Sequence, residues 1–229
     1  MKKIVVLSGA GISQESGIKT FRDSDGLWEG HDVQEVASFD GFMRNQSLVL
    51  DFYNQRRRQL LEVEPNAAHY SLVALEQKYE VNIITQNVDD LHERAGSKNV
   101  MHLHGELLKA RSLNDEHTIY DRKTDIVVGD LAPDGSQLRP HIVWFGEMVP
   151  LLEPAARQVA EADMLIIVGT SMQVYPAASL CAYAAEDSKM YYVDPNPKIN
   201  HELSLAKHLE VIKEKAGKGL PGLVKKLLD

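Results

Sequence analysis

Four short apolar runs, each closed by glycine or polar residues, constrain the fold of this chain more than any other feature. They lie at 4–7, 81–85, 164–169 and 190–193. Apolar runs of this length are typical of strands buried on both faces of a parallel sheet. Helical patterns lie between and after them, at 91–95, 151–162, 177–186 and 219–228. This repeated succession of strand, turn and helix predicts an α/β fold with a Rossmann-like, doubly wound parallel sheet.

Two stretches interrupt the repeat. Residues 28–64 are helix-rich and end at Pro65, and residues 111–139 are polar with turn signals at Gly129 and Gly135. We expect these two insertions to build a smaller module over one end of the sheet. The expected division is a Rossmann-like core of about 1–27, 65–110 and 140–229, and a small module of about 28–64 and 111–139.

Length and charge exclude several classes of protein. The chain has 229 residues, which suits one globular domain, and 25 basic against 33 acidic side chains give a net charge of −8. A net-acidic surface repels phosphate backbones, so we expect no nucleic acid partner. The N-terminal apolar run stops at Ser8, too early for a signal peptide, and no stretch is long enough to span a membrane. We therefore expect a cytoplasmic protein without a membrane partner.

A glycine-rich segment, Ser8-Gly9-Ala10-Gly11, directly follows the first predicted strand. Glycines at this place let backbone N–H groups approach a pyrophosphate beside a helix N-terminus. The segment alone is also compatible with a plain tight turn. Gln14 stands where the common dinucleotide fingerprint has a third glycine, which disfavours a hydride-transferring dehydrogenase.

The glycine-rich segment belongs to a longer motif at 9–22, Gly-Ala-Gly-Ile-Ser-Gln-Glu-Ser-Gly-Ile-Lys-Thr-Phe-Arg. Four further motifs follow it in a characteristic order. They are Thr-Gln-Asn-Val-Asp at 85–89, His-Gly-Glu at 104–106, Val-Trp-Phe-Gly-Glu at 143–147 and Gly-Thr-Ser at 169–171. With these motifs the chain resembles the sirtuins, which are NAD-dependent protein-lysine deacylases. The resemblance implies one sirtuin-type catalytic domain over 1–229. It also implies that acyl groups leave lysine side chains with release of nicotinamide and O-acyl-ADP-ribose.

The resemblance also implies a set of residues that bind NAD. Gln86 and Asn87 would contact the nicotinamide ribose and Asp89 the carboxamide, while Phe21 would shield the nicotinamide and Arg22 would lie near the phosphates. The full expected set is Gly9, Ala10, Gly11, Ile12, Ser13, Gly17, Phe21, Arg22, Gln86, Asn87, Val88, Asp89, Gly169, Thr170, Ser171, Asp194, Asn196 and Ala216. Asp194 occupies a position where the family usually has asparagine, and a carboxylate still suits ribose hydroxyls.

Histidine is the side chain most often used as a base near neutral pH, and this chain has nine. The His-Gly-Glu match places the catalytic base at His104 and leaves His102 structural. His69 reads as a packed helix residue, whereas His92 and His201 read as surface or capping residues.

The acyl group would be recognised by a helix at 51–58. Tyr53 and Arg56 share one face of that helix and match the Tyr-x-x-Arg pair of sirtuins that remove succinyl and malonyl groups. A guanidinium and a phenol suit a carboxylate-bearing acyl tail. Ala37 matches a small residue that leaves room for it, and Arg57 and Arg58 read as a solvated face. The substrate peptide would pair by its backbone with the segment at 143–147, through Val143, Phe145, Gly146 and Glu147.

The chain departs from the family in one segment. Most sirtuins bind a structural zinc through two cysteine pairs after the catalytic histidine, but residues 111–139 contain no cysteine, and the chain has only Cys181. His117 and scattered carboxylates do not form a zinc pattern, so we expect no zinc. A tight hairpin, packing on the helical module or an oligomer contact would have to order the segment, and a mobile segment is the alternative. The simplest assembly is a monomer that acts on acyl-lysine proteins or peptides.

Two other functions remain open on the sequence. One is a strict deacetylase or ADP-ribosyltransferase on the same scaffold, against which the Tyr53 and Arg56 pair weighs. The other is a non-catalytic sensor of NAD or ADP-ribose. A pure binding module has no need of a base, so His104 weighs against it.

Overall fold

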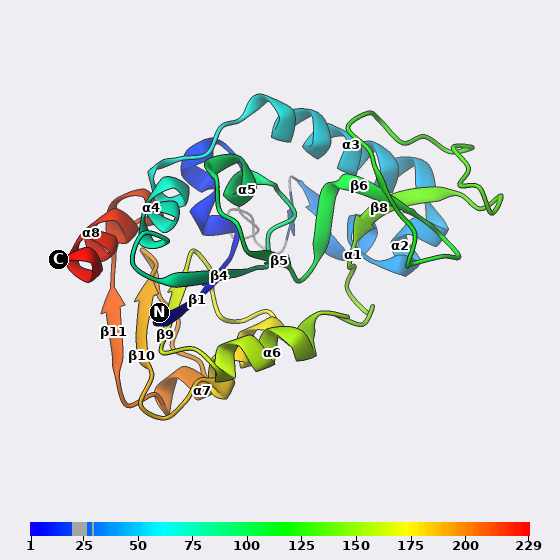
Figure 1. The fold of residues 1–229 in the computed structure, drawn as a ribbon. Helices are drawn as coiled ribbons and strands as arrows, with labels where there is room; N and C mark the ends of the chain where they lie inside the picture. Colours follow the sequence, from blue (N-terminus) through cyan, green and yellow to red (C-terminus); the bar gives the residue numbers. More distant parts are fainter. Residues whose placement is uncertain (20–26, 29) are drawn as a thin grey trace.

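The computed structural model describes residues 1–19, 27–28 and 30–229, and its centre is a six-stranded parallel sheet (Figure 1). The strands are β1 (Lys3–Ser8), β4 (Glu80–Thr85), β5 (Val100–His102), β9 (Met164–Val168), β10 (Lys189–Val193) and β11 (Leu209–Ile212). They lie in the order β11-β10-β9-β1-β4-β5, and each neighbouring pair is parallel. The chain thus starts in the middle, builds one edge and then builds the other. This is the doubly wound, Rossmann-like order, and it confirms the predicted fold class.

Both faces of the sheet are covered, which explains why its strands are apolar without alternation. Ile4 and Val6 of β1 face a core shared with α4 (Ala67–Leu75) and α8 (Ala216–Leu228). Val5 and Leu7 face the opposite core, with α6 (Leu152–Ala160), α7 (His201–Ser204) and the 3-10 helix at Ala177–Tyr183. Figure 1 shows these two groups of helices on opposite sides of the sheet.

Three elements differ from the sequence prediction. The expected helix at 177–186 is a 3-10 helix that ends at Tyr183, and the strands β5 and β11 were not predicted. Strand β5 has only three residues and β11 contains Glu210, so neither forms the apolar run from which a strand could be predicted. Among the helices of the described residues, none combines the length and apolar character that a membrane crossing requires.

A small module lies beside the parallel sheet, at the right of Figure 1. It contains α1 (Val33–Val36), α2 (Phe39–Arg44), α3 (Gln46–Glu62) and the antiparallel sheet β7-β6-β8, with β6 at Gly105–Ser112, β7 at Ile119–Asp121 and β8 at Leu138–Ile142. A two-stranded ribbon of β2 (Leu27–Trp28) and β3 (His31–Asp32) precedes the helices. Helices and sheet share one core that includes Phe42, Phe52, Leu107 and Trp144. The antiparallel sheet extends beyond the expected 111–139 segment at both ends.

Hydrogen bonds to α3 order the cysteine-free segment. The Asn54 amide donates to the carbonyl of Ile126 at 2.8 Å and accepts from its N–H at 2.9 Å. Arg58 forms an ion pair with Asp125 at 2.5 Å. Asn54 and Ile126 are both buried, so their paired polar groups are shielded from water. A hairpin-based sheet and packing on the helical module, two of the devices left open by the sequence, together hold the segment.

Replacing Asn54 with alanine is expected to lower the free energy of unfolding by about 2–4 kcal/mol. The change strips both backbone partners from buried Ile126 and removes the oxygen that accepts from Arg57 at 2.6 Å. Urea denaturation measures the loss, and hydrogen exchange should increase across residues 119–131. Gln55→Ala on the exposed side of the same helix is the control. Equal stability of the two variants would show that the Asn54 contacts do not hold the segment.

Candidate active site

A cavity of about 510 Å³ lies where the carboxyl ends of β1, β4 and β9 meet the small module. In doubly wound sheets, this switch in strand order is where ligands bind. Its lining includes most of the predicted residues: Gly9, Ala10, Gly11, Ala37, Tyr53, Arg56, Gln86, Asn87, Val88, Asp89, His104, Val143, Phe145, Gly146, Glu147, Gly169, Thr170, Ser171, Asp194, Asn196 and Ala216. Residues from the first insertion, 28–64, and from the core thus line one space, whereas the second insertion, 111–139, contributes none of the lining.

Close packing of two glycine loops forms the floor of the cavity. The N–H of Gly9 donates to Val168 at 3.0 Å, and the N–H of Gly11 donates to Gly169 at 2.8 Å. A Cβ on Gly11 would lie 2.7 Å from the Cα of Gly169, and Gly169 itself has a φ of +62°. The loops after β1 and β9 can touch only because these residues lack side chains. The floor therefore carries no side chain at Gly9, Gly11 or Gly169, which leaves room for the diphosphate of a dinucleotide against the backbone.

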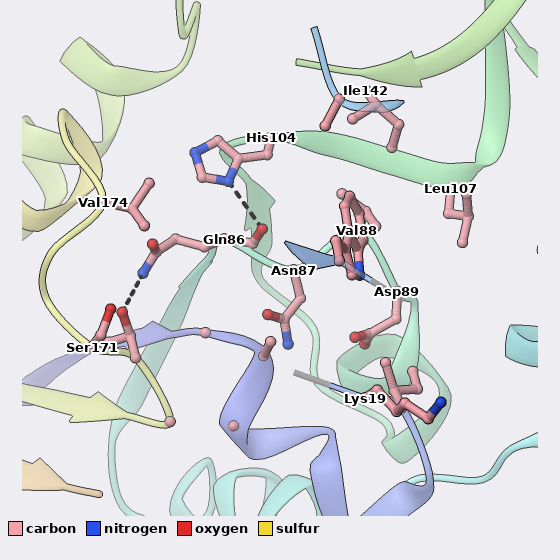
Figure 2. A pocket seen from close by; sticks show the side chains of 18 of the residues that line it. Lys19, Gln86, Asn87, Val88, Asp89, His104, Leu107, Ile142, Ser171 and Val174 are labelled. Atoms are coloured by element: carbon pink, nitrogen blue, oxygen red, sulfur yellow. Dashed lines mark hydrogen bonds between the residues drawn. The ribbon is translucent and has the colours of Figure 1, made fainter. Parts of the chain in front are cut away.

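The loop after β4 carries the polar end of the cavity (Figure 2). Gln86 donates through Nε2 to the Thr170 hydroxyl at 3.0 Å. Ser13 donates to the Asp89 carboxylate at 2.9 Å and accepts from the Asn87 amide at 3.2 Å. Ser13 does not line the cavity, so its contacts orient Asn87 and Asp89 from behind. Burial raises the pKa of Asp89 to about 6, although the Ser13 hydroxyl and the Leu91 N–H oppose the shift.

The buried Asp89 carboxyl destabilises the ligand-free protein at neutral pH. The unfolded carboxyl ionises above about 3.8, whereas the folded one stays protonated up to about 6. The native state binds more protons in this window, so stability falls as the pH rises through it. The full cost above pH 6 is about 3 kcal/mol.

Asp89→Asn is therefore expected to raise the free energy of unfolding at pH 8 by about 2–3 kcal/mol, because the amide cannot ionise. The advantage should shrink as the pH falls from 6 to 4, where the wild-type carboxyl is protonated in the fold. Urea denaturation across this pH range measures it, with Asp187→Asn at an exposed position as control. A gain that does not depend on pH would contradict the assigned cause.

His104 points a ring nitrogen into the cavity. Its Nδ1 lies 3.1 Å from the carbonyl oxygen of Gln86, which can only accept, so Nδ1 carries the proton and Nε2 has the free lone pair. Burial lowers the pKa of His104, against the opposing hydrogen bond to Gln86. The ring is therefore neutral at pH 7 and can accept a proton through Nε2.

The neighbouring histidines are structural, and one differs from expectation. His102 bridges the Asn87 carbonyl at 3.0 Å and Glu93 at 2.7 Å. Burial disfavours its charge, but Glu93 outweighs that effect and the pKa of His102 is raised. His69 is packed as predicted. The expectation of a surface or capping role for His92 is wrong: it is fully buried and meets the Ser8 hydroxyl at 2.9 Å, because α5 (Leu91–Ala95) packs over the sheet edge.

Helix α3 presents Tyr53 and Arg56 to the same cavity. The Asn45 side chain caps the helix start by accepting the N–H of Leu48 at 3.1 Å. The Arg56 Nη1 donates to the carbonyl of Phe52 at 2.6 Å, and its guanidinium carbon lies 3.9 Å from the centre of the Phe52 ring. These contacts fix the direction of the guanidinium.

The predicted solvated face is only half correct. Arg58 is exposed, but Arg57 is 0% exposed and donates to the Leu107 carbonyl at 3.2 Å and to Asn54. Burial lowers the pKa of Arg57 to about 10. Sequence spacing could not reveal this, because the antiparallel sheet covers the side of α3 that carries Arg57.

The segment at 143–147 is not a strand, apart from one bridge. The N–H of Val143 donates to His104, and the N–H of Phe145 donates to Ala37, both at 2.9 Å. Phe145 pairs with Ser38 in an isolated parallel bridge. The Glu147 carboxylate accepts from Arg139 at 2.6 Å and from the Trp144 N–H at 2.8 Å. Glu147 lines the cavity, yet its oxygens are engaged by the chain itself.

Asp194 and Asn196 line the far end of the cavity, beyond β10, together with Ala216 at the start of α8. Asp194 is 1% exposed, and its carboxylate accepts the N–H of Asn196 at 2.8 Å. A buried acceptor of this kind fits ribose hydroxyls. The residues at both ends therefore fit an extended dinucleotide such as NAD.

Some predicted cofactor residues do not line the cavity. Ile12 and Ser13 are buried beneath it, and Gly17 forms a turn with a φ of +99°. Phe21 and Arg22 lie outside the described residues. Lys19 and Trp28 line the cavity and were not predicted: Lys19 lies within the string at 9–22 but was not assigned a role, and Trp28 belongs to none of the motifs. In the described part of the chain, no cluster of three or more His, Cys, Asp or Glu is arranged to hold a metal ion.

The chain is similar to known proteins in sequence and in fold. A family model described as the Sir2 family matches residues 9–176. An NAD-dependent protein deacylase from Helicobacter pylori is 59% identical over 229 residues, which cover 100% of this chain and 99% of the relative. A Sir2 homolog–NAD complex superposes with a TM-score of 0.87 at 38% identity, over 99% of this chain and 90% of that one. A Sir2–p53 peptide–NAD+ complex gives a TM-score of 0.79 at 30% identity, over 98% and 91% of the chains. The glycine loops, the His104 site and these matches together show that the chain belongs to the Sir2 family.

Proposed function

We propose that this protein removes negatively charged acyl groups, succinyl and malonyl among them, from protein lysine side chains in an NAD-dependent reaction. The observation that carries the proposal is the placement of Tyr53 and Arg56 on the cavity that His104 also lines. The broader class, an NAD-dependent protein deacylase, rests on the relatives of this name, which reach 59% identity over the whole chain.

Different parts of the cavity would bind different parts of NAD. The glycine loops at 9–11 and 169–171 would hold the diphosphate, and Asp194 and Asn196 the adenosine ribose. Asn87 and Asp89, oriented by Ser13, would hold the nicotinamide end. When bound, NAD supplies a ribose carbon that becomes electrophilic as nicotinamide leaves.

His104 acts as the base. Its Nδ1–H is committed to the Gln86 carbonyl, so Nε2 is the atom that accepts a proton. The lowered pKa keeps Nε2 unprotonated at neutral pH, as the role requires. Gln86 is itself tied to Thr170, so the loop after β4 and the loop after β9 hold the imidazole together.

The acyl tail would extend toward α3. A carboxylate there meets the Arg56 guanidinium and the Tyr53 phenol, whose burial raises its pKa and keeps the hydroxyl protonated. Ala37 is small and leaves the approach open. The lysine peptide would lie along the segment at 143–147, which carries only one strand bridge of its own.

A mass-spectrometric time course with NAD tests the proposal. One lysine peptide is supplied as its succinyl, malonyl and acetyl forms, with reactions lacking NAD as controls. Faster NAD-dependent release of the two charged groups supports the proposal. Preferred removal of acetyl would contradict it and favour a strict deacetylase, and no turnover of any form would favour a sensor.

A further inference from the structure

Trp144 lines the cavity beside Tyr53, at the end proposed to hold the acyl group. Trp144 is 2% exposed and lies between α2 and α3, with its ring centre 5.1 Å from that of Phe42 and 6.2 Å from that of Tyr53. Its indole Nε1 lies 2.9 Å from the Tyr53 hydroxyl oxygen. Trp144 thus touches directly one of the two groups proposed to bind the acyl carboxylate.

The direction of this hydrogen bond is unambiguous. An indole N–H can only donate, so the Tyr53 oxygen accepts. The single phenol proton then remains for another acceptor. Hydrogen bonds in series polarise one another, which makes a phenol that accepts from one side a stronger donor on the other. A carboxylate can only accept, so it matches a hydroxyl oriented in this way.

Arg139 and Glu147 fix Trp144 in place. The Arg139 guanidinium carbon lies 3.4 Å from the centre of a Trp144 ring, a cation–π contact in a buried setting. Its two terminal nitrogens donate to Glu147 at 2.6 and 3.1 Å, and Glu147 also accepts the Trp144 backbone N–H at 2.8 Å. The indole is therefore held at its backbone and at its ring face.

We infer that Trp144 is a specificity-determining residue that orients the Tyr53 hydroxyl as a donor to carboxylate-bearing acyl groups. This inference rests on the proposed function, because it matters only if the acyl group carries a carboxylate. The competing explanation is that Trp144 only fills space in the core of the small module. The two explanations differ because packing would affect every acyl group, whereas orientation of a donor affects charged ones.

A double-mutant cycle of Trp144→Phe and Tyr53→Phe separates them. The measured quantity is the ratio of kcat/KM for a succinyl peptide to that for the matching acetyl peptide. We expect Trp144→Phe to lower the ratio about tenfold, the size of one lost hydrogen bond to a charged group. In the Tyr53→Phe background it should lower the ratio no further, because no hydroxyl remains to be oriented.

A second variant controls for disrupted packing of the core, because it keeps the size of the Trp144 ring. Benzothienylalanine at position 144 replaces the N–H with sulfur and keeps the size of the ring, and it should lower the ratio as Trp144→Phe does. An unchanged ratio in either variant, or losses that multiply in the double mutant, would overturn the inference. Wild-type protein in the same assay tests the proposed function separately. A wild-type preference for acetyl overturns both, whereas a succinyl preference that survives at position 144 overturns this inference alone.

Discussion

Replacement of His104 with alanine is expected to lower turnover of an acylated peptide by about 10²–10⁴-fold, the usual contribution of a positioned base. Its Nε2 is the proton acceptor on the cavity, since Nδ1 is committed to Gln86. NAD affinity should be largely retained, because the glycine loops and the Ser13, Asn87 and Asp89 network do not involve the imidazole. Steady-state kinetics and calorimetric titration with NAD measure the two effects.

The matched control for this change is His201→Ala at the exposed start of α7. It should leave both turnover and NAD affinity as in the wild type. If His104→Ala kept more than about a tenth of the activity, the base would have to be another group. If it lost NAD binding as well, the change would have disrupted the loop after β4, and the assigned role would lack support.

Arg56→Met is expected to reverse the acyl preference. Methionine keeps an apolar stem of similar length against Phe52 but removes the charge that faces the acyl carboxylate. A hydrogen bond to a charged group is worth about 1.5–3 kcal/mol, so kcat/KM for a succinyl peptide should fall about 10- to 100-fold. Deacetylation does not use the charge and should then become the faster reaction.

Arg58→Met serves as its control. Arg58 lies two residues further along α3 and is exposed. It forms an ion pair with Asp125 and does not line the cavity. The same change of charge there should leave the ratio of the two reactions unchanged. Desuccinylation that survives in Arg56→Met would remove this guanidinium from acyl recognition, and a loss in both variants would point to long-range charge instead.

Local patterns predicted the parts of this molecule that depend on neighbours in sequence. The strands follow from apolar runs, and residues placed directly after a parallel strand must meet at one edge of the sheet. For this reason Gly9, Gln86 and Gly169 could be placed in one site before the fold was known. The helical position of Tyr53 and Arg56 follows in the same way from a three-residue spacing.

The burial of individual polar side chains depends on tertiary packing and could not be predicted from local patterns. Arg57 and His92 are buried because other elements cover their sides of α3 and α5, and neither helix pattern encodes that cover. The carboxylate of Glu147 accepts from Arg139 and from the Trp144 backbone, a role that the sequence did not indicate, while the predicted backbone pairing of its segment with a substrate peptide stays a prediction. Contacts such as that of Glu147 with Arg139 on β8 join different elements of the fold, so they produce no periodic pattern from which a single sequence could predict them.

The segment at 111–139 contains no cysteine and is held by contacts to helix α3. Asn54 and Arg58 make these contacts, from the helix that also carries Tyr53 and Arg56. The segment and the acyl end of the cavity are therefore supported by opposite sides of one helix.

The most direct test of charge recognition in the cavity compares a succinyl-lysine peptide with its terminal amide, which has nearly the same size but no charge. Initial rates with saturating NAD are measured for both and for the acetyl peptide. We expect the succinyl peptide to react about tenfold or more faster than the amide, since only the carboxylate engages Arg56 and Tyr53 as an ion. Equal rates for the charged and neutral peptides would contradict recognition of charge in this cavity.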